Sequence, residues 1–163
     1  KLKFQLIKKM DKKISECDFV VICAPLSEYQ RIFSLCNKHL KKNVVVTDVG
    51  STKKSIITKI NKIKRKDINW ISSHPIAGSE VSGPSNGDED LFINKWSVII
   101  KQKNSSNTQM KKIMKFWKFL GSKSVIMDAD QHDKFKKLHL LDVILVGFAQ
   151  LAIIATIIIA ITF

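Results

Sequence analysis

Two short polar segments carry the residue types that could perform chemistry. Ser51 lies in the segment 47–53, and His74 directly follows Ser72 and Ser73. Each segment follows an apolar, strand-like run, and α/β proteins place reactive groups at the ends of such strands. A neutral imidazole can accept a hydroxyl proton near neutral pH. If the two preceding strands are neighbours, Ser51 and His74 can converge on one atom, which predicts an enzyme site.

Both residues also have a plainer structural interpretation. Ser51 or Thr52 could be the N-cap of the helix that follows, a role that serine fills often. His74 precedes Pro75 and could be a structural turn residue. The residues alone leave both alternatives open.

The elements that must position these side chains follow from apolar patterning. Short continuous apolar runs predict strands that are buried on both faces of a sheet, and apolar residues at helical spacing predict helices between them. The predicted strands are 18–24, 44–47, 69–73, 96–100 and 124–127, the predicted helices are 29–40, 52–64 and 110–120, and 74–94 is a predicted loop. This alternation indicates an α/β fold with a parallel sheet and helices on both sides.

The charge of the chain is unusual, whereas its apolar content is ordinary. The 163 residues carry a formal net charge of +14, which comes mainly from lysine, because Arg31 and Arg65 are the only arginines. A nucleic-acid-binding protein more often shows a concentrated basic stripe with arginine and stacking aromatics. The scattered lysines indicate a compositional bias, so we expect no nucleic-acid partner, although the positive field favours an anionic ligand.

Three cysteines, Cys17, Cys23 and Cys36, lack the spacing of a metal site. Cys23 lies inside an apolar run. We therefore expect thiols in a reducing compartment, which favours a cytoplasmic protein with no bound metal.

The character of the sequence changes after Asp128. Residues 129–138 have a helical pattern, and residues 143–163 contain no charged side chain, a length that could cross a bilayer. Gln150 and the small residues near it suit packing against protein. We therefore favour a buried helix at 143–163 over a membrane segment.

Together the polar segments resemble motifs of the prephenate dehydrogenase family, which includes the arogenate and cyclohexadienyl dehydrogenases of tyrosine synthesis. Residues 48–53 are similar to the D-x-G-S-x-K turn of that family, and residues 74–83 are similar to its H-P-x-A-G-[ST]-E-x-S-G loop. Residues 90–92 and the pair His132-Asp133 also fall where the family has D-L-F and H-D. The resemblance covers most of residues 16–135.

This resemblance implies a partial Rossmann-like domain at 1–128, followed at 129–163 by the first helix of an all-α dimerisation domain. It implies NAD or NADP as the cofactor, prephenate or arogenate as the small-molecule substrate, and a homodimer for the full-length protein. The family's N-terminal strand and glycine-rich phosphate turn have no counterpart in this sequence. The alternative is therefore a non-catalytic remnant that keeps the sheet, and weak binding of NAD by this chain is expected.

The resemblance also implies roles for individual residues. His74 would accept the hydroxyl proton during hydride transfer, and Ser51 would orient that hydroxyl or the edge of the nicotinamide. His132 and Asp133 are expected to cap the helix that opens the second domain. The remaining implied roles are substrate binding by Ser79, Glu80 and His139, and cofactor binding by Ala24, Pro25, Gly50 and Ser51.

Overall fold

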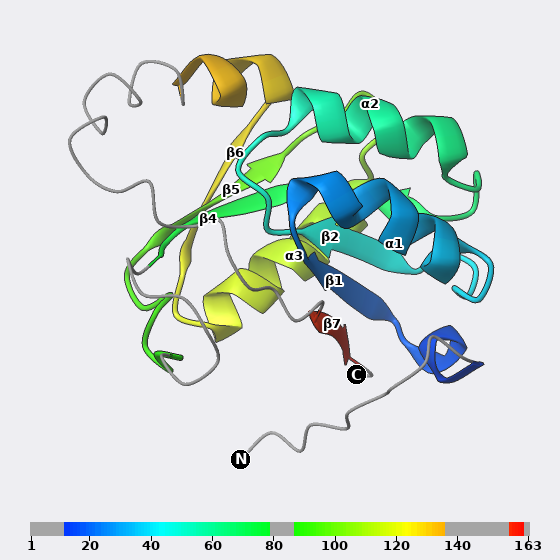
Figure 1. Ribbon diagram of the computed structural model, residues 1–163. Coiled ribbons are helices and arrows are strands. Elements are labelled where there is room, and N and C mark those ends of the chain that lie inside the picture. Colours follow the sequence, from blue (N-terminus) through cyan, green and yellow to red (C-terminus); the bar gives the residue numbers. More distant parts are fainter. Residues whose placement is uncertain (1–11, 79–86, 136–156, 162–163) are drawn as a thin grey trace.

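Strand β1 (Phe19–Cys23) is buried on both of its faces, because every residue from Phe19 to Ile22 is apolar and almost fully enclosed. The computed structural model of the protein describes residues 12–78, 87–135 and 157–161 (Figure 1). The other elements are η1 (Lys12–Glu16), η2 (Leu26–Glu28), α1 (Tyr29–Asn37), β2 (Val45–Asp48), α2 (Lys54–Ile63), β3 (Asn69–Trp70), β4 (Ser73–Ile76), β5 (Trp96–Ile100), α3 (Asn107–Phe119), β6 (Lys123–Met127), β7 (Ile157–Ile161) and a helix at 129–135.

The strands form two sheets. The first has the order β3-β2-β1-β7, and the second has the order β4-β5-β6. β1, β2 and β3 are parallel, as are β5 and β6, whereas β4 is antiparallel to β5.

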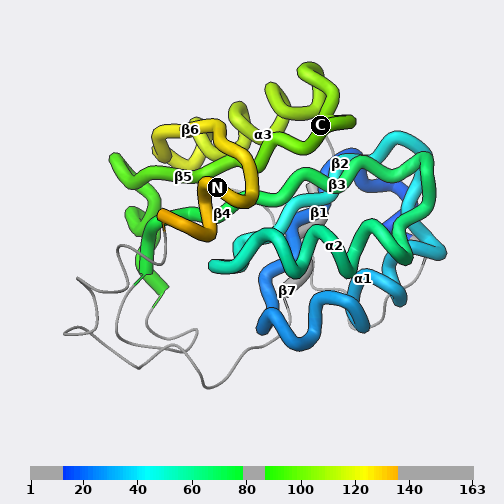
Figure 2. Tube along the Cα trace, turned by 90° about the horizontal axis from the view of Figure 1, so that it is seen from above, coloured from blue at the N-terminus to red at the C-terminus, as the bar shows by residue number. Residues whose placement is uncertain are grey.

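Helices cover both faces of the first sheet. α1 and α2 lie on one side of β1 and β2, and α3 lies on the other side (Figures 1 and 2). The alternation of side chains along β1 explains this layering, since Val20 and Ile22 pack with α1 and α2, while Phe19 and Val21 pack with α3. α3 ends before Gly121, whose φ of 81° is the left-handed conformation common after helices.

These elements confirm the predicted α/β class and most of the predicted strands and helices. The single strand expected at 69–73 is wrong, because these residues divide between β3 and the first residue of β4, which belong to different sheets. The loop expected to begin at 74 is wrong for 74–76, which continue β4 and pair with β5. The second sheet is therefore mixed rather than wholly parallel.

The helix expected at 143–163 is wrong for Ile157–Ile161, which form β7 antiparallel to β1. A run of isoleucines favours a strand, since β-branched side chains pack well on a pleated surface. The other residues of that prediction, 143–156 and 162–163, lie outside the described residues. Within the described ranges, no helix is both long enough and apolar enough to span a bilayer.

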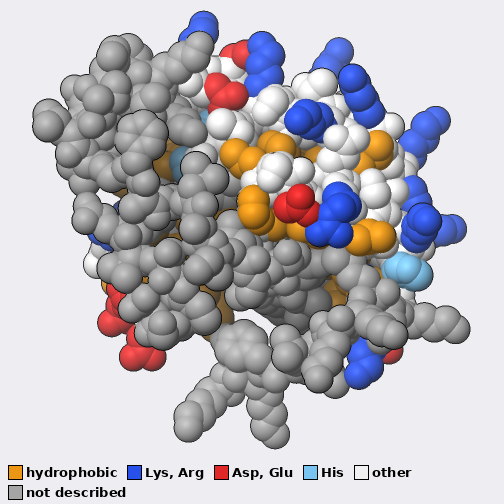
Figure 3. Space-filling view, viewed as in Figure 1, with side chains coloured by type: hydrophobic (Ala, Val, Ile, Leu, Met, Phe, Trp, Pro, Cys, Tyr) orange, Lys and Arg blue, Asp and Glu red, His pale blue; other side chains and the backbone are white. Residues whose placement is uncertain are grey.

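The surface charge is dispersed. Figure 3 shows lysine and arginine side chains spread over the described part of one face, with acidic side chains among them. Exposed ion pairs of the described residues include Arg31 with Glu28 and Lys54 with Asp130, both at 2.6 Å. On this face the pattern agrees with the compositional interpretation of the lysine content.

Candidate active site

The turn after β2 is closed by a buried ion pair. Asp48 Oδ2 lies 2.7 Å from Lys53 Nζ, and both side chains are fully enclosed. The same oxygen accepts the backbone N–H of Gly50 at 3.0 Å. The carboxylate therefore holds both ends of the turn that contains Ser51.

Gly50 lies close to the side chains of Leu26 and Tyr29. A Cβ atom there would come 2.5 Å from Leu26 Cδ2 and 3.0 Å from the Tyr29 hydroxyl oxygen. A side chain at this position would therefore require the tip of Leu26 to move, so glycine suits this close approach to Leu26 and Tyr29.

The same ion pair joins the end of β2 to the start of β4. The Ser72 hydroxyl donates to Asp48 Oδ1 at 2.5 Å, and Lys53 Nζ donates to the Ser73 carbonyl at 2.5 Å. The Ser73 hydroxyl donates to the Asp48 carbonyl at 2.9 Å. These bonds bring the turn of Ser51 and the first residues of β4, including His74, to the same edge of the fold.

His74 is half-buried on β4, and its ring contacts a second histidine that lies 58 residues further along the chain. His74 Nδ1 lies 2.9 Å from Nε2 of His132, and the two rings meet edge to face at 72°. His132 is only 4% exposed, and its Nδ1 lies 2.8 Å from Oδ1 of Asp133. The three side chains form a continuous His-His-Asp chain.

Asp133 also holds the beginning of α2. Its Oδ1 accepts the backbone N–H of Lys53, and its Oδ2 accepts that of Lys54, each at 3.1 Å. Burial alone would raise the pKa of Asp133, but the hydrogen bonds from His132 and from these two amides lower it. The carboxylate is therefore ionised at neutral pH, and the site contains one fixed negative charge beside the histidine pair.

Two sequence predictions are corrected by this arrangement. Neither Ser51 nor Thr52 is the N-cap of α2, because the cap position is Lys53 and no side chain of that residue caps the helix. His132 and Asp133 do not cap their own helix, since Asp128 there accepts the backbone N–H of Gln131 at 2.8 Å. Asp133 instead caps α2 from a distant part of the chain.

The residues predicted to lie beside a cofactor share one edge of the sheet. β1 and β2 are parallel, with Ile22 opposite Asp48, so Ala24 and Gly50 both lie just beyond the carboxyl ends of adjacent strands. Ala24 and Pro25 are half-buried, and Gly50 is buried. This edge offers small side chains where a dinucleotide binds in open α/β sheets.

The thiol at the end of β1 is unsuited to nucleophilic chemistry. Burial, aided by the nearby Asp48 carboxylate, raises the pKa of Cys23 to about 12. The cysteine is therefore a neutral thiol at neutral pH.

The other predicted site residues, Ser79, Glu80 and His139, lie outside the described residues. Within the described ranges, no group of three or more His, Cys, Asp or Glu side chains could hold a metal ion.

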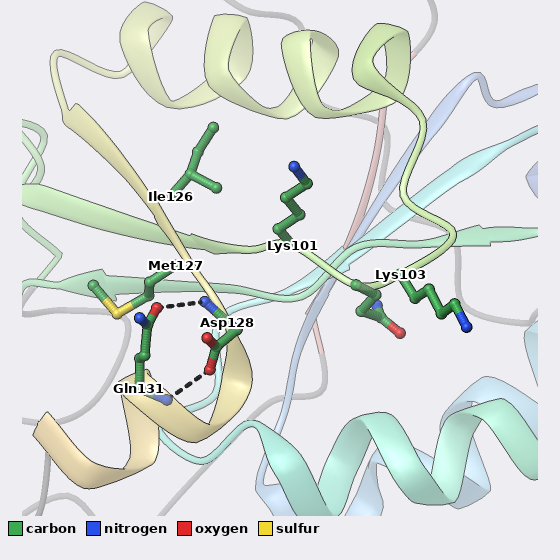
Figure 4. A pocket seen from close by; sticks show the side chains of 7 residues that line it. Lys101, Lys103, Ile126, Met127, Asp128 and Gln131 are labelled. Carbon is green, nitrogen blue, oxygen red and sulfur yellow. Dashed lines mark hydrogen bonds between the residues drawn. The ribbon is translucent and has the colours of Figure 1, made fainter.

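A separate hollow of about 410 Å³ opens at the carboxyl ends of β5 and β6 (Figure 4). Its walls include Lys101, Met127 and Asp128, and Asp128 exchanges two hydrogen bonds with Gln131 there. Neither Ser51 nor His74 lines it, so it is distinct from the candidate site.

Comparison with known proteins identifies the family. Residues 1–126 match the family model described as the nucleotide-binding domain of prephenate dehydrogenase. The chain belongs to the prephenate dehydrogenase family.

Relatives and solved structures agree with this assignment. The chain is 29% identical over 120 residues to a cyclohexadienyl dehydrogenase from Zymomonas mobilis, covering 74% of this chain and 41% of the relative. It is 30% identical over 125 residues to a prephenate dehydrogenase from Lactococcus lactis, covering 76% and 33%. It thus spans about a third to two fifths of the length of these relatives.

The fold is similar to that of A. aeolicus prephenate dehydrogenase, solved in complex with hydroxyphenyl propionate and NAD+. The TM-score is 0.71 at 23% identity, and the likeness covers 85% of this chain and 52% of that one. This likeness supports the Rossmann-like fold of the described residues.

Sequence reasoning missed two parts of the site. It assigned no role to Lys53. The D-x-G-S-x-K motif at 48–53 was a signal that its lysine could form an ion pair with its aspartate. It also did not foresee the contact between His74 and His132. The H-D pair was visible in the sequence, but its spatial neighbour lies in another motif.

Proposed function

We propose that the protein is an NAD(P)-dependent dehydrogenase that oxidatively decarboxylates prephenate to 4-hydroxyphenylpyruvate, a step of tyrosine synthesis in the cytoplasm. Membership of the family supports the reaction class. The observation that carries the proposal is the position of His74, half-buried beside the Ser51 turn at the edge where the sheet offers a cofactor site.

The residues present fit a nicotinamide cofactor at this edge. Ala24, Pro25 and Gly50 present small or rigid groups at the ends of β1 and β2, which allows a dinucleotide to approach the backbone. Ser51 would contact its nicotinamide end. When bound, NAD or NADP supplies the acceptor of the hydride.

His74 performs the proton chemistry in this proposal. Its unprotonated ring nitrogen accepts the proton of the ring hydroxyl while the hydride leaves the same carbon, which becomes a carbonyl. The bond between the ring and its carboxylate then breaks and carbon dioxide departs. The bonding electrons complete the aromatic ring and convert the carbonyl to a phenolate oxygen, which takes back a proton from His74. Ser51 orients the hydroxyl toward the imidazole.

The roles of residues beyond the described ranges follow the same proposal. Ser79 and Glu80 would line the mouth of the site, and His139 would contact the substrate. Residues 1–128 would form the cofactor-binding domain, and the helix at 129–135 would begin a helical domain through which two copies pair.

The first prediction concerns His74→Asn in the complete gene product. We expect its turnover of prephenate to fall by about 10²- to 10⁴-fold, which is the usual contribution of a general base. NAD reduction and carbon dioxide release are measured together. His39→Asn is the matched control, because His39 is exposed on the surface. Equal turnover in the His74 variant and the wild type would remove His74 from the mechanism.

A further inference from the structure

The chemistry of Asp133 fixes the protons along the His-His-Asp chain. An ionised carboxylate can only accept hydrogen bonds, so the 2.8 Å contact requires a proton on Nδ1 of His132. When His132 carries only this one proton, its Nε2 is unprotonated. That nitrogen can only accept, so the proton in its 2.9 Å contact belongs to Nδ1 of His74.

This assignment leaves the lone pair of His74 on Nε2. We propose that His132, held by Asp133, is a positioning residue that keeps His74 in the tautomer whose Nε2 accepts the substrate proton. The inference rests on the proposed function, because it gives a role to a residue that does not itself need to touch the substrate.

Burial and ring geometry support a positioning role. His132 is 4% exposed, so water competes little for its nitrogens. The two rings stand 5.1 Å apart, centre to centre, in an edge-to-face arrangement that fixes the plane of His74 as well as its tautomer. Asp133 is anchored in turn by the Lys53 and Lys54 amides, so the three hydrogen-bonded side chains are held at the start of α2.

His132 and Asp133 also stabilise His74 after proton transfer. A proton added at Nε2 makes the His74 imidazolium, whose Nδ1–H still donates to His132. The carboxylate of Asp133 lies at the other end of the chain, where its negative charge favours the cation. His132 therefore supports both the initial tautomer and the product of the step.

The tautomer can be tested without turnover. In nitrogen-15 NMR spectra of the histidine-labelled chain, we expect neutral His74 to carry its proton on Nδ1 and to have an unprotonated Nε2. His132→Ala should remove this preference, while His132→Gln should keep it in part, because the Gln carbonyl can accept from Nδ1. Exposed His39 is the internal reference. Wild-type His74 protonated on Nε2 would overturn the inference.

Kinetics in the complete gene product test whether the positioning of His74 by His132 affects turnover. We expect kcat to fall on the order of 10²-fold in His132→Ala, with partial recovery in His132→Gln and little change in KM. An unaltered kcat in His132→Ala, with its amide spectrum showing an intact fold, would also overturn the inference. If wild-type protein shows the expected tautomer but does not convert prephenate, the proposed function fails instead.

Discussion

At the scale of single residues, the buried Asp48–Lys53 pair determines the shape of the site. Both side chains are fully enclosed, and the lysine also donates to the Ser73 carbonyl. Moving two charges out of water is costly, and their mutual attraction offsets this cost only when further hydrogen bonds complete the arrangement. Here Ser72 and the Gly50 amide supply those bonds to the carboxylate. The pair joins the turn after β2 to the start of β4. Removing one partner should therefore lower the free energy of unfolding far more than removing both.

This gives a prediction for Lys53→Met. An unpaired buried carboxylate should lower the free energy of unfolding by about 3–5 kcal/mol, measured by urea titration of the chain. Asp48→Asn combined with Lys53→Met should recover part of that loss. Lys54→Met is the control, because the Lys54–Asp130 pair is 66% and 63% exposed and should be worth at most about 1 kcal/mol. Equal losses in the two lysine variants would show that burial does not determine the cost.

At the scale of elements, the start of α2 is completed from outside the helix. The sequence offered Ser51 and Thr52 as caps, and local rules favour such residues. The backbone amides of Lys53 and Lys54 instead donate to the carboxylate of Asp133, which lies 80 positions after Lys53 in the chain. Local propensity could not reveal a cap that exists only after the helix at 129–135 has packed against α2. Figure 1 shows that helix (orange) beside the beginning of α2.

The cap should be sensitive to acid. The pKa of Asp133 in the folded chain lies below its ordinary 3.8, so the unfolded chain takes up the proton first as pH falls. The cap therefore contributes fully above about pH 3.8 and is lost as pH falls through the lowered folded value. NMR titration should show the Lys53 and Lys54 amides shifting with a midpoint below 3.8. Asp133→Asn should abolish that shift, and Asp130→Asn should not.

An amide inside α2 provides the control for this titration. The N–H of Ile57 donates to the Lys53 carbonyl within the helix, so it should move little over the same pH range. A midpoint above 3.8 for the Lys53 amide would contradict the direction of the pKa shift.

At the scale of the whole molecule, the pattern of apolar residues predicted the layers of helices and strands better than the direction and pairing of the strands. The layers follow from sequence because β1 is apolar on both faces and α1, α2 and α3 each have one apolar face. The reversal at β4 was not predictable in the same way. Residues 69–76 form one stretch in the sequence, but its two ends enter different sheets, and strand direction depends on long-range pairing with β5. The site showed the same limit. The motifs predict roles for Ser51 and His74, whereas the contact of His74 with His132 depends on how distant segments pack.

The final prediction concerns the sheet edge that β7 covers. β1 pairs with β2 on one side and, over all five of its residues, with Ile157–Ile161 on the other. A strand with an uncovered edge presents unpaired amides and carbonyls that favour association with another chain. Ending the chain at residue 156 should therefore speed amide hydrogen exchange in 19–23 and produce self-association, measured by exchange mass spectrometry and sedimentation. In the 163-residue chain, Ile159→Pro should likewise speed exchange in 19–23 and favour self-association, because proline lacks the N–H and disrupts the hydrogen bonds between strands. If exchange in 19–23 stays at its wild-type rate in both variants, β7 does not protect this edge in solution.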